Sequence, residues 1–346
     1  MAPTPRTARL VGLDLARGLA VVSMLVAHLS PVGGVLDLSE YLTAPLFAVV
    51  IGVAMGLQLG RRHPGVIPFL VANVQRGLVL LVLGLVLQTL YGQVDVVLPY
   101  LGILVLVLAP VALVLHRAPV LLLGLAASLA VLGPLVTERA RDAEVAAGDR
   151  WPGIGADLVT WLASGDSYRL VSFLPMALAG LALAAVVVEV SRGTRGWGVA
   201  GVLTVASVGA YLLGASSADG AAAYSGSTAE VLGASFLASA VVVACFALAD
   251  AVTLSGGGVA ARVAGPVLAT GRLALTAYTA QILWLVLVSL VRGTGVSDDS
   301  WLVLSSTAVV VVGGCWALER WWGTGPLEWL LHVIRPVAPE GRDRSG

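Results

Sequence analysis

Residues 78–87 read Leu-Val-Leu-Leu-Val-Leu-Gly-Leu-Val-Leu and lie within a longer apolar segment over 68–90. A helix with this sequence is apolar on every side, so it suits lipid or a helix-packed interior. About 20 apolar residues are enough for a helix to cross a bilayer, and this segment is long enough. The stretch therefore predicts a membrane span.

Similar apolar segments recur along the chain, whose 346 residues are 58% hydrophobic and only 12% charged, whereas soluble domains are near a quarter charged. We predict an all-α, polytopic transmembrane helix bundle. The about ten predicted spans are residues 10–29, 41–59, 68–90, 96–115, 118–136, 169–190, 197–214, 230–252, 267–291 and 301–321. The chain then divides into an N-terminus (1–9), a transmembrane domain (10–321) and an amphipathic tail (322–346).

The charged residues and the cysteines exclude several kinds of function. Twenty basic and twenty acidic residues cancel, which removes the basic excess that a nucleic-acid partner would need. Every basic residue is arginine, so no lysine is present for a Schiff base or a P-loop. Cys245 and Cys315 each lie inside an apolar run, and we expect neither a disulfide framework nor a metal site.

The distribution of arginine predicts the orientation in the membrane. With ten spans and the N-terminus inside, thirteen arginines fall in cytoplasmic segments and five fall on the opposite side. Positive residues stay on the cytoplasmic side of short loops, so we predict a multi-pass protein of the cell membrane with both termini in the cytoplasm. The external stretch 137–168 is interpreted as a lid over an external pocket or as a solvated linker, and its composition favours the linker.

Polar residues near the cytoplasmic ends of three spans form the first candidate site. Asp14 and Arg17 lie three apart on one helix face, and Arg76 begins the third span. Arg272 and Thr276 share one stripe of the helix predicted over 267–291. An ionisable residue in a span costs about 2.5–3.5 kcal/mol, and the arginine fork matches phosphate oxygens. The alternatives are a helix-packing ion pair for Asp14–Arg17 and snorkelling to the headgroups for the other two arginines.

Two further polar residues, Tyr278 and Gln281, lie on the other side of the predicted helix over 267–291.

The second candidate site lies at the opposite membrane boundary. His28 follows Asp14 by fourteen residues, or about 21 Å of helix, and Asp95 lies at the outer start of the fourth span. A carboxylate bonded to one ring nitrogen would leave the other nitrogen as a general base. The alternative is an interfacial or capping histidine.

The residues from Arg9 to Ala20, Arg-Leu-Val-Gly-Leu-Asp-Leu-Ala-Arg-Gly-Leu-Ala, followed by Met24 and His28, resemble the first core helix of a known family. That family comprises the heparan-α-glucosaminide N-acetyltransferases and the related bacterial YeiB-like membrane proteins. Further stretches resemble the YeiB-like branch: Asp95 followed by Tyr100, Gly271 to Tyr278 with Gln281, and Gly325 to Trp329.

The resemblance implies a reaction in which acetyl-CoA, bound from the cytosolic side, delivers its acetyl group to an acceptor across the membrane. The catalytic candidates are then His28 and Asp95. The candidates for binding the acyl-CoA are Asp14, Arg17, Arg76, Arg272, Thr276, Tyr278 and Gln281. In the acetyltransferase branch a loop histidine acts, whereas here the loop 29–42 has none and His28 ends the helix.

Three functions compete at this point. The first is a membrane acyltransferase that moves an acyl group, in the simplest case acetyl, from cytosolic acyl-CoA to an extracytoplasmic glycan or other hydroxyl or amine acceptor. The second is a transporter or flippase without covalent chemistry, and the third is a membrane scaffold. The expected partners are the lipid bilayer and a small-molecule or glycan acceptor, and a homodimer is compatible with this organisation.

Overall fold

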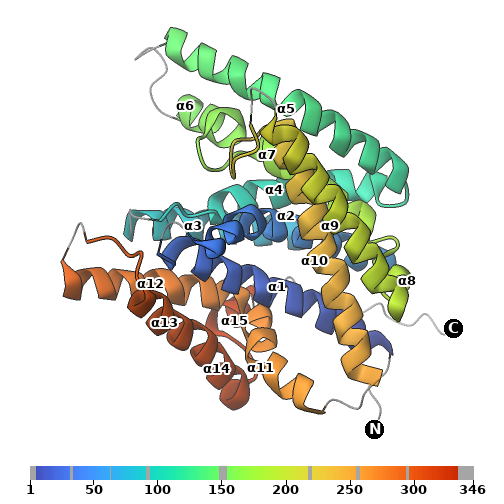
Figure 1. Ribbon diagram of the computed structural model, residues 1–346, viewed down its shortest axis with the longest axis vertical. Coiled ribbons are helices and arrows are strands. Elements are labelled where there is room, and N and C mark those ends of the chain that lie inside the picture. Colours follow the sequence, from blue (N-terminus) through green and yellow to red (C-terminus); the bar gives the residue numbers. More distant parts are fainter. Residues whose placement is uncertain are drawn as a thin grey trace, which may run out of the picture.

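The computed structural model describes residues 5–31, 34–62, 64–90, 94–147, 154–216, 220–254, 258–293 and 296–333 (Figure 1). Over these residues the chain forms helices and no strand, which confirms the predicted all-α bundle. Nine of the described helices are long and apolar enough to cross a membrane, and the shorter apolar helix Leu170–Leu183 accompanies them. Together they correspond to the ten predicted segments and make the chain a multi-pass membrane protein.

The α-helices are α1 (Pro5–Leu29), α2 (Glu40–Arg62), α3 (Val66–Leu90), α4 (Leu98–Leu115), α5 (Pro119–Ala147), α6 (Ile154–Val159), α7 (Leu170–Leu183), α8 (Val187–Val190), α9 (Thr194–Ala215), α10 (Thr228–Leu254), α11 (Gly258–Arg272), α12 (Ala274–Arg292), α13 (Trp301–Ala308), α14 (Gly314–Trp322) and α15 (Pro326–Val333). A 3₁₀ turn, η1 (Val35–Ser39), precedes α2, and two π turns, η3 (Thr160–Ser164) and η4 (Val309–Gly313), interrupt the helical order later in the chain.

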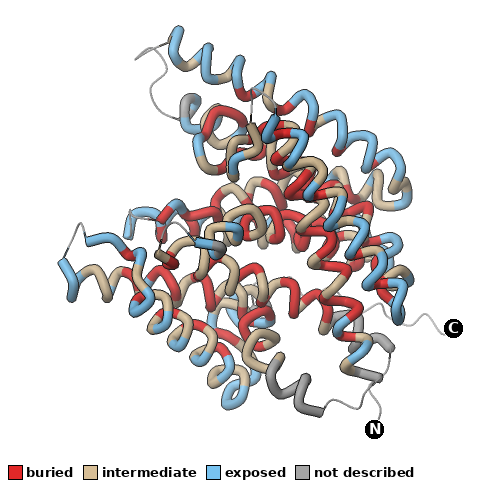
Figure 2. The backbone as a smooth tube through the Cα atoms, in the orientation of Figure 1, coloured by how far each residue is buried: buried red, intermediate tan, exposed pale blue. Residues whose placement is uncertain are grey.

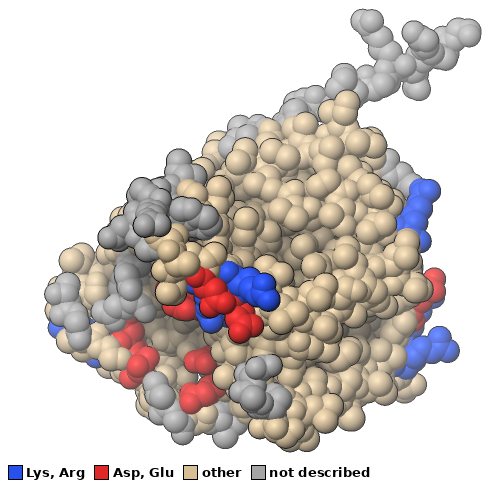
Figure 3. Space-filling view, turned by 90° about the horizontal axis from the view of Figure 1, so that it is seen from above, with Lys and Arg blue, Asp and Glu red and all other residues tan. Residues whose placement is uncertain are grey.

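The buried core lies where α1, α2, α4, α7 and α10 meet, whereas α5 and α9 expose much of their length (Figure 2). Many of the exposed residues are large and apolar, such as Val202, Val205 and Leu213 on α9. Figure 3 shows a broad face of the molecule with few charged side chains. A surface of this kind is suited to lipid, which confirms the membrane character predicted from hydropathy.

Glycines allow the closest helix crossings. A Cβ atom added at Gly52 would lie 2.0 Å from the Ala177 carbonyl oxygen, and one at Gly180 would lie 2.2 Å from that of Val49, so α2 and α7 approach to backbone contact. The sequence predicts close packing for the run Gly52, Gly56 and Gly60. Gly56 also faces α7, whereas Gly60 is exposed with nothing within 4 Å, so the prediction holds for two of the three.

The predicted external stretch 137–168 is largely helical where the structure describes it. The helix α5 continues past the expected span to Ala147, and α6 and η3 follow before α7 begins. Arg141 donates to the Ser164 carbonyl at 3.2 Å, and Ser164 donates to the Glu144 carboxylate at 2.6 Å. These bonds hold η3 against the end of α5. The predicted span over 169–190 consists of α7 and the short α8, joined by a turn.

The prediction of a single continuous helix over residues 267–291 is wrong. The chain leaves helical geometry at Leu273, where φ is −107° and ψ is 35°, so α11 ends at Arg272 and α12 begins at Ala274. The cause is tertiary. Gly271 packs on the backbone of α1, and the first amides of α12 bond to the Glu328 side chain rather than to α11 carbonyls. Arg272 and Thr276 therefore do not share one helical stripe.

Candidate functional site

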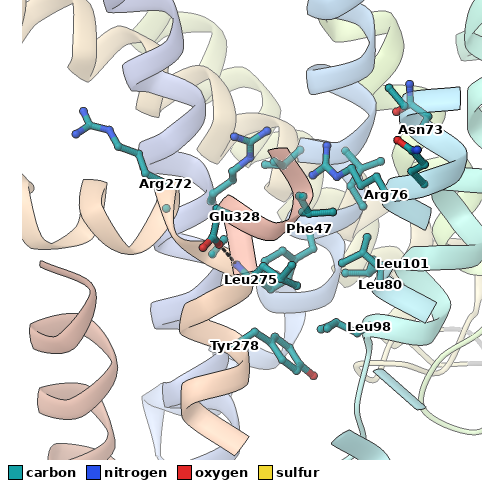
Figure 4. A pocket seen from close by; sticks show the side chains of 18 of the residues that line it. Phe47, Asn73, Arg76, Leu80, Leu98, Leu101, Arg272, Leu275, Tyr278 and Glu328 are labelled. Carbon is teal, nitrogen blue, oxygen red and sulfur yellow. Dashed lines mark hydrogen bonds between the residues drawn. The ribbon is translucent and has the colours of Figure 1, made fainter. Parts of the chain in front are cut away.

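A pocket of about 320 Å³ opens between seven helices, α1, α2, α3, α4, α11, α12 and α15, and contains most of the residues predicted to bind the acyl-CoA (Figure 4). Its volume is at the lower end of the range for ligand sites, which is about 300–1,000 Å³. It is large enough for part of an acyl-CoA, such as the arm that carries the acyl group. The lining residues are Arg17, Phe47, Val50, Ile51, Gln58, Ala72, Asn73, Gln75, Arg76, Leu80, Leu98, Leu101, Gly271, Arg272, Ala274, Leu275, Tyr278, Glu328 and Leu331.

Three arginines from three different helices line this pocket: Arg17 on α1, Arg76 on α3 and Arg272 at the end of α11. Asp14 bridges two of them. Its Oδ1 lies 3.4 Å from Arg17 Nη1, and its Oδ2 lies 3.5 Å from Arg272 Nε. Arg272 Nη1 also contacts Glu319 on α14. Asp14 thus holds Arg17 and Arg272 in place, and each of these two guanidinium groups has five N–H donors, more than these ion pairs use.

The position of Arg272 depends on a close contact between α1 and α11. A Cβ atom at Gly271 would lie only 1.7 Å from the Asp14 carbonyl oxygen, and one at Gly18 would lie 2.0 Å from the Val267 carbonyl oxygen. Only glycine permits this approach, which brings Arg272 within reach of the Asp14 side chain. The resemblance motifs around Asp14 and around Gly271 are therefore in direct contact.

Glu328 on α15 is a site residue that the sequence reasoning did not select. Its Oε1 accepts from the backbone N–H groups of Leu275 (2.9 Å) and Thr276 (3.1 Å), and its Oε2 accepts from Thr276 Oγ1 (2.5 Å). These bonds satisfy the first amides of α12, which the break at Leu273 leaves without helical partners. Glu328 belongs to the stretch Gly325 to Trp329, and that resemblance was the available signal.

Tyr278 lines the end of the pocket opposite the arginines, beside Leu98, as Figure 4 shows. Its hydroxyl accepts a hydrogen bond from the backbone N–H of Val97 at 3.2 Å. Val97 is two residues after Asp95. The inner end of the pocket is therefore separated by little more than the Tyr278 ring from the segment that carries Asp95.

The two remaining candidates for acyl-CoA binding do not line the pocket. Thr276 donates to Glu328 and so helps to fix α15. Gln281 is 1% exposed, and neither its Oε1 nor its Nε2 has a hydrogen-bond partner among the described residues. The structure thus brings together Arg17, Arg76, Arg272 and Tyr278 of the predicted set, with Asp14 behind them.

Asp95 is exposed and accepts a hydrogen bond from Ser167 Oγ at 2.5 Å. His28, at the end of α1, is half-buried. No hydrogen bond joins the two side chains in the part of the chain that the structure describes, whereas the predicted orienting role needs one. The carboxylate is held by Ser167, a residue that sequence reasoning missed.

Three tyrosines meet next to Ser167, the residue that holds Asp95, and none of them was a predicted site residue, although Tyr100 belongs to the resemblance motif. Tyr168 is at the centre, with ring centroids 5.6 Å from Tyr100 and 5.5 Å from Tyr224, both in edge-to-face geometry. Burial raises the pKa of the Tyr168 hydroxyl well above its ordinary value, so this hydroxyl is protonated at neutral pH. The rings come from α4, from the segment before α7 and from the segment before α10, so no local pattern predicts their meeting.

The site thus has two levels. We call the region of Asp14, Arg17, Arg76 and Arg272 the arginine end, and the region of Asp95, Ser167, Tyr168 and Tyr224 the tyrosine end. Among the described residues, no group of three or more histidine, cysteine, aspartate or glutamate side chains is arranged to hold a metal ion.

No family model matches the chain, and no curated protein matches it. The resemblance to the acetyltransferase and YeiB-like proteins therefore rests on the motifs in the sequence.

Proposed function

We propose that this protein is an integral membrane acyltransferase that takes an acyl group, in the simplest case acetyl, from acyl-CoA at the arginine end. The group is passed to a hydroxyl or amine acceptor, such as a glycan, that approaches from the tyrosine end. One observation carries the proposal: a single pocket has three arginines at one end and, at the other, a tyrosine bonded to the segment of Asp95.

The arginine end suits the phosphates of an acyl-CoA. Arg17, Arg76 and Arg272 come from separate helices and all line one pocket, which snorkelling alone does not require. Guanidinium groups bind phosphate oxygens through paired N–H donors. Phe47 and Leu101 are among the apolar residues of the walls, which suit the acyl chain of the donor.

The chemistry that this arrangement would support is acyl transfer. The acceptor oxygen or nitrogen attacks the thioester carbonyl, a new C–O or C–N bond forms, the C–S bond breaks, and the thiol leaves. His28 would take the proton of the acceptor as a general base and return it to the departing sulfur, so that a thiol leaves, and Asp95 would line the approach of the acceptor. If the arginine end is cytoplasmic, as the arginine distribution predicts, the acceptor is extracytoplasmic.

Purified protein in detergent, supplied with acetyl-CoA and a panel of glycans and amines, tests the proposal. We expect release of free thiol that depends on the acceptor. Arg76→Ala should raise the KM for acetyl-CoA, whereas Arg195→Ala, which removes an arginine that does not line the pocket, should leave it unchanged. Equal turnover in His28→Ala and wild type would remove the assignment of the base.

A transporter or flippase is the competing function, and it would use the same pocket without breaking a bond. The pocket reaches the arginine end and is closed toward Asp95 by Tyr278 and Val97, a form that alternating access also requires. Proteoliposomes distinguish the two functions. Accumulation of a solute with no release of thiol for any acceptor would refute the acyltransferase proposal.

A further inference from the structure

A small cavity of about 10 Å³ lies at the tyrosine end and shares no lining residue with the pocket described above. Two oppositely charged side chains line it: Arg169, which precedes α7, and Glu230, in the first turn of α10. Arg169 is 1% exposed and Glu230 is 4% exposed. Buried charges are retained only where other groups compensate them, so each of the two side chains needs polar partners here.

The Arg169 guanidinium is only partly satisfied. Its Nη2 donates to the carbonyl oxygen of Asp166 at 3.1 Å and also to that of Tyr224. Its Nε and Nη1 are buried and have no hydrogen-bond partner among the described residues. Unpaired buried atoms are rare, and those of a charged group are the most costly to leave unpaired. These two nitrogens therefore need an acceptor inside the cavity.

Glu230 lines the same cavity but does not supply that acceptor directly. No ion pair joins its carboxylate to Arg169 in the part of the chain that the structure describes. Gly226, whose φ is 71°, lies beside the guanidinium. A Cβ atom added there would be 3.1 Å from Arg169 Nη1 and 3.1 Å from Ser172 Oγ. The cavity wall thus offers N–H donors from Arg169, a carboxylate acceptor from Glu230 and a hydroxyl from Ser172.

The volume and the charges together decide which occupant fits. A water molecule needs about 10–15 Å³ of such a volume and two to four polar partners, and the cavity meets both conditions. A carboxylate or phosphate group with its several heavy atoms needs more room. A halide ion would accept from Arg169, but the Glu230 carboxylate would repel it. Water can accept from Arg169 and donate to Glu230 at the same time.

We infer that this cavity is a binding site for one water molecule, which accepts from Arg169 Nε or Nη1 and donates to the Glu230 carboxylate. The bridge joins α10 to the segment before α7. That segment carries Ser167, which also lines the cavity and whose hydroxyl holds Asp95. The water site does not depend on the proposed function, because none of its residues binds the acyl donor.

An experimental map of the wild-type protein that resolves ordered water tests the site directly. We expect one peak within hydrogen-bond distance of both the Arg169 guanidinium and the Glu230 carboxylate. The inference is overturned if other buried waters are visible and this peak is absent, or if the two side chains form a direct ion pair. Crystals grown in sodium bromide separate water from a halide, since an anomalous signal in the cavity would also overturn it.

Thermal unfolding of variants tests the bridge in solution. Glu230→Gln removes the countercharge of a buried guanidinium and should lower the midpoint by at least about 5 °C. Combined with Arg169→Gln, the loss should be smaller than the sum of the two single losses, because the two side chains share one bridge. Arg141→Gln is the matched control. Arg141 bonds to the same segment through the Ser164 carbonyl but does not line the cavity, so its loss should add to that of Glu230→Gln. Additive losses for the Arg169 pair would refute the bridge.

Discussion

The close approach of α1 and α11 makes Gly271→Ala the most informative single substitution. The added methyl carbon would lie 1.7 Å from the Asp14 carbonyl oxygen and 2.7 Å from the Gly18 nitrogen, whereas ordinary contacts begin at 3.4 Å. The helices must therefore separate locally by about 1.7 Å, which is the difference between 3.4 and 1.7 Å. Overpacking of this kind costs about 1–3 kcal/mol, and we expect the upper value because the blocking atoms belong to backbone.

The assay is thermal unfolding in detergent, followed by the fluorescence of the nine tryptophans. We expect the midpoint of Gly271→Ala to fall by about 5 °C. The affinity for acetyl-CoA should fall as well, because the 3.5 Å contact between Arg272 and Asp14 depends on the same approach. Gly265→Ala is the control in the same helix. It has nothing within 4 Å of the added carbon and should be neutral or stabilising by up to about 1 kcal/mol. Equal stability of the two variants would refute the reasoning.

Three further outcomes follow from other contacts. Glu328→Ala removes the acceptor for the first amides of α12 and should destabilise the protein by about 1–2 kcal/mol, with faster hydrogen exchange at Leu275 and Thr276. Single cysteines at Asp166 and Arg195 should react with an impermeant thiol reagent from opposite sides of the membrane, and reaction from one side would contradict the predicted orientation; both native cysteines are buried. Ser167→Ala should lower turnover several-fold in an acyl-transfer assay, with an unchanged Kd for acetyl-CoA, because its hydroxyl bonds to Asp95 and not to the pocket.

The spans could be predicted because hydropathy depends on the local sequence alone. A helix over residues 78–87 is apolar on every side, and this stretch lies within α3 as expected. The pocket arginines could also be predicted from the sequence, because a charged residue inside an apolar span is conspicuous. Arg17 and Arg76 were selected on that ground, and both line the pocket.

The partners of these residues could not be predicted, because they come from distant parts of the chain. Glu328 reaches α12 across more than fifty residues of sequence, and Ser167 meets Asp95 across seventy-two. The break at Leu273 was missed for a related reason. No proline or other strong helix breaker stands between Arg272 and Tyr278, and the break depends on contacts with α1 and α15.

That break is what allows Arg272 and Tyr278 to serve one pocket. In a continuous helix the six steps from Arg272 to Tyr278 would turn the two side chains about 120° apart, on different sides of the helix. Because the helix is interrupted at Leu273, so that α11 ends at Arg272 and α12 begins at Ala274, Arg272 lines the arginine end while Tyr278 lines the other end of the same cavity. The break also leaves two amides to be satisfied in an apolar setting, and Glu328 satisfies them while holding α15 at the pocket wall. The start of α12 and the closure of the pocket therefore depend on the same carboxylate.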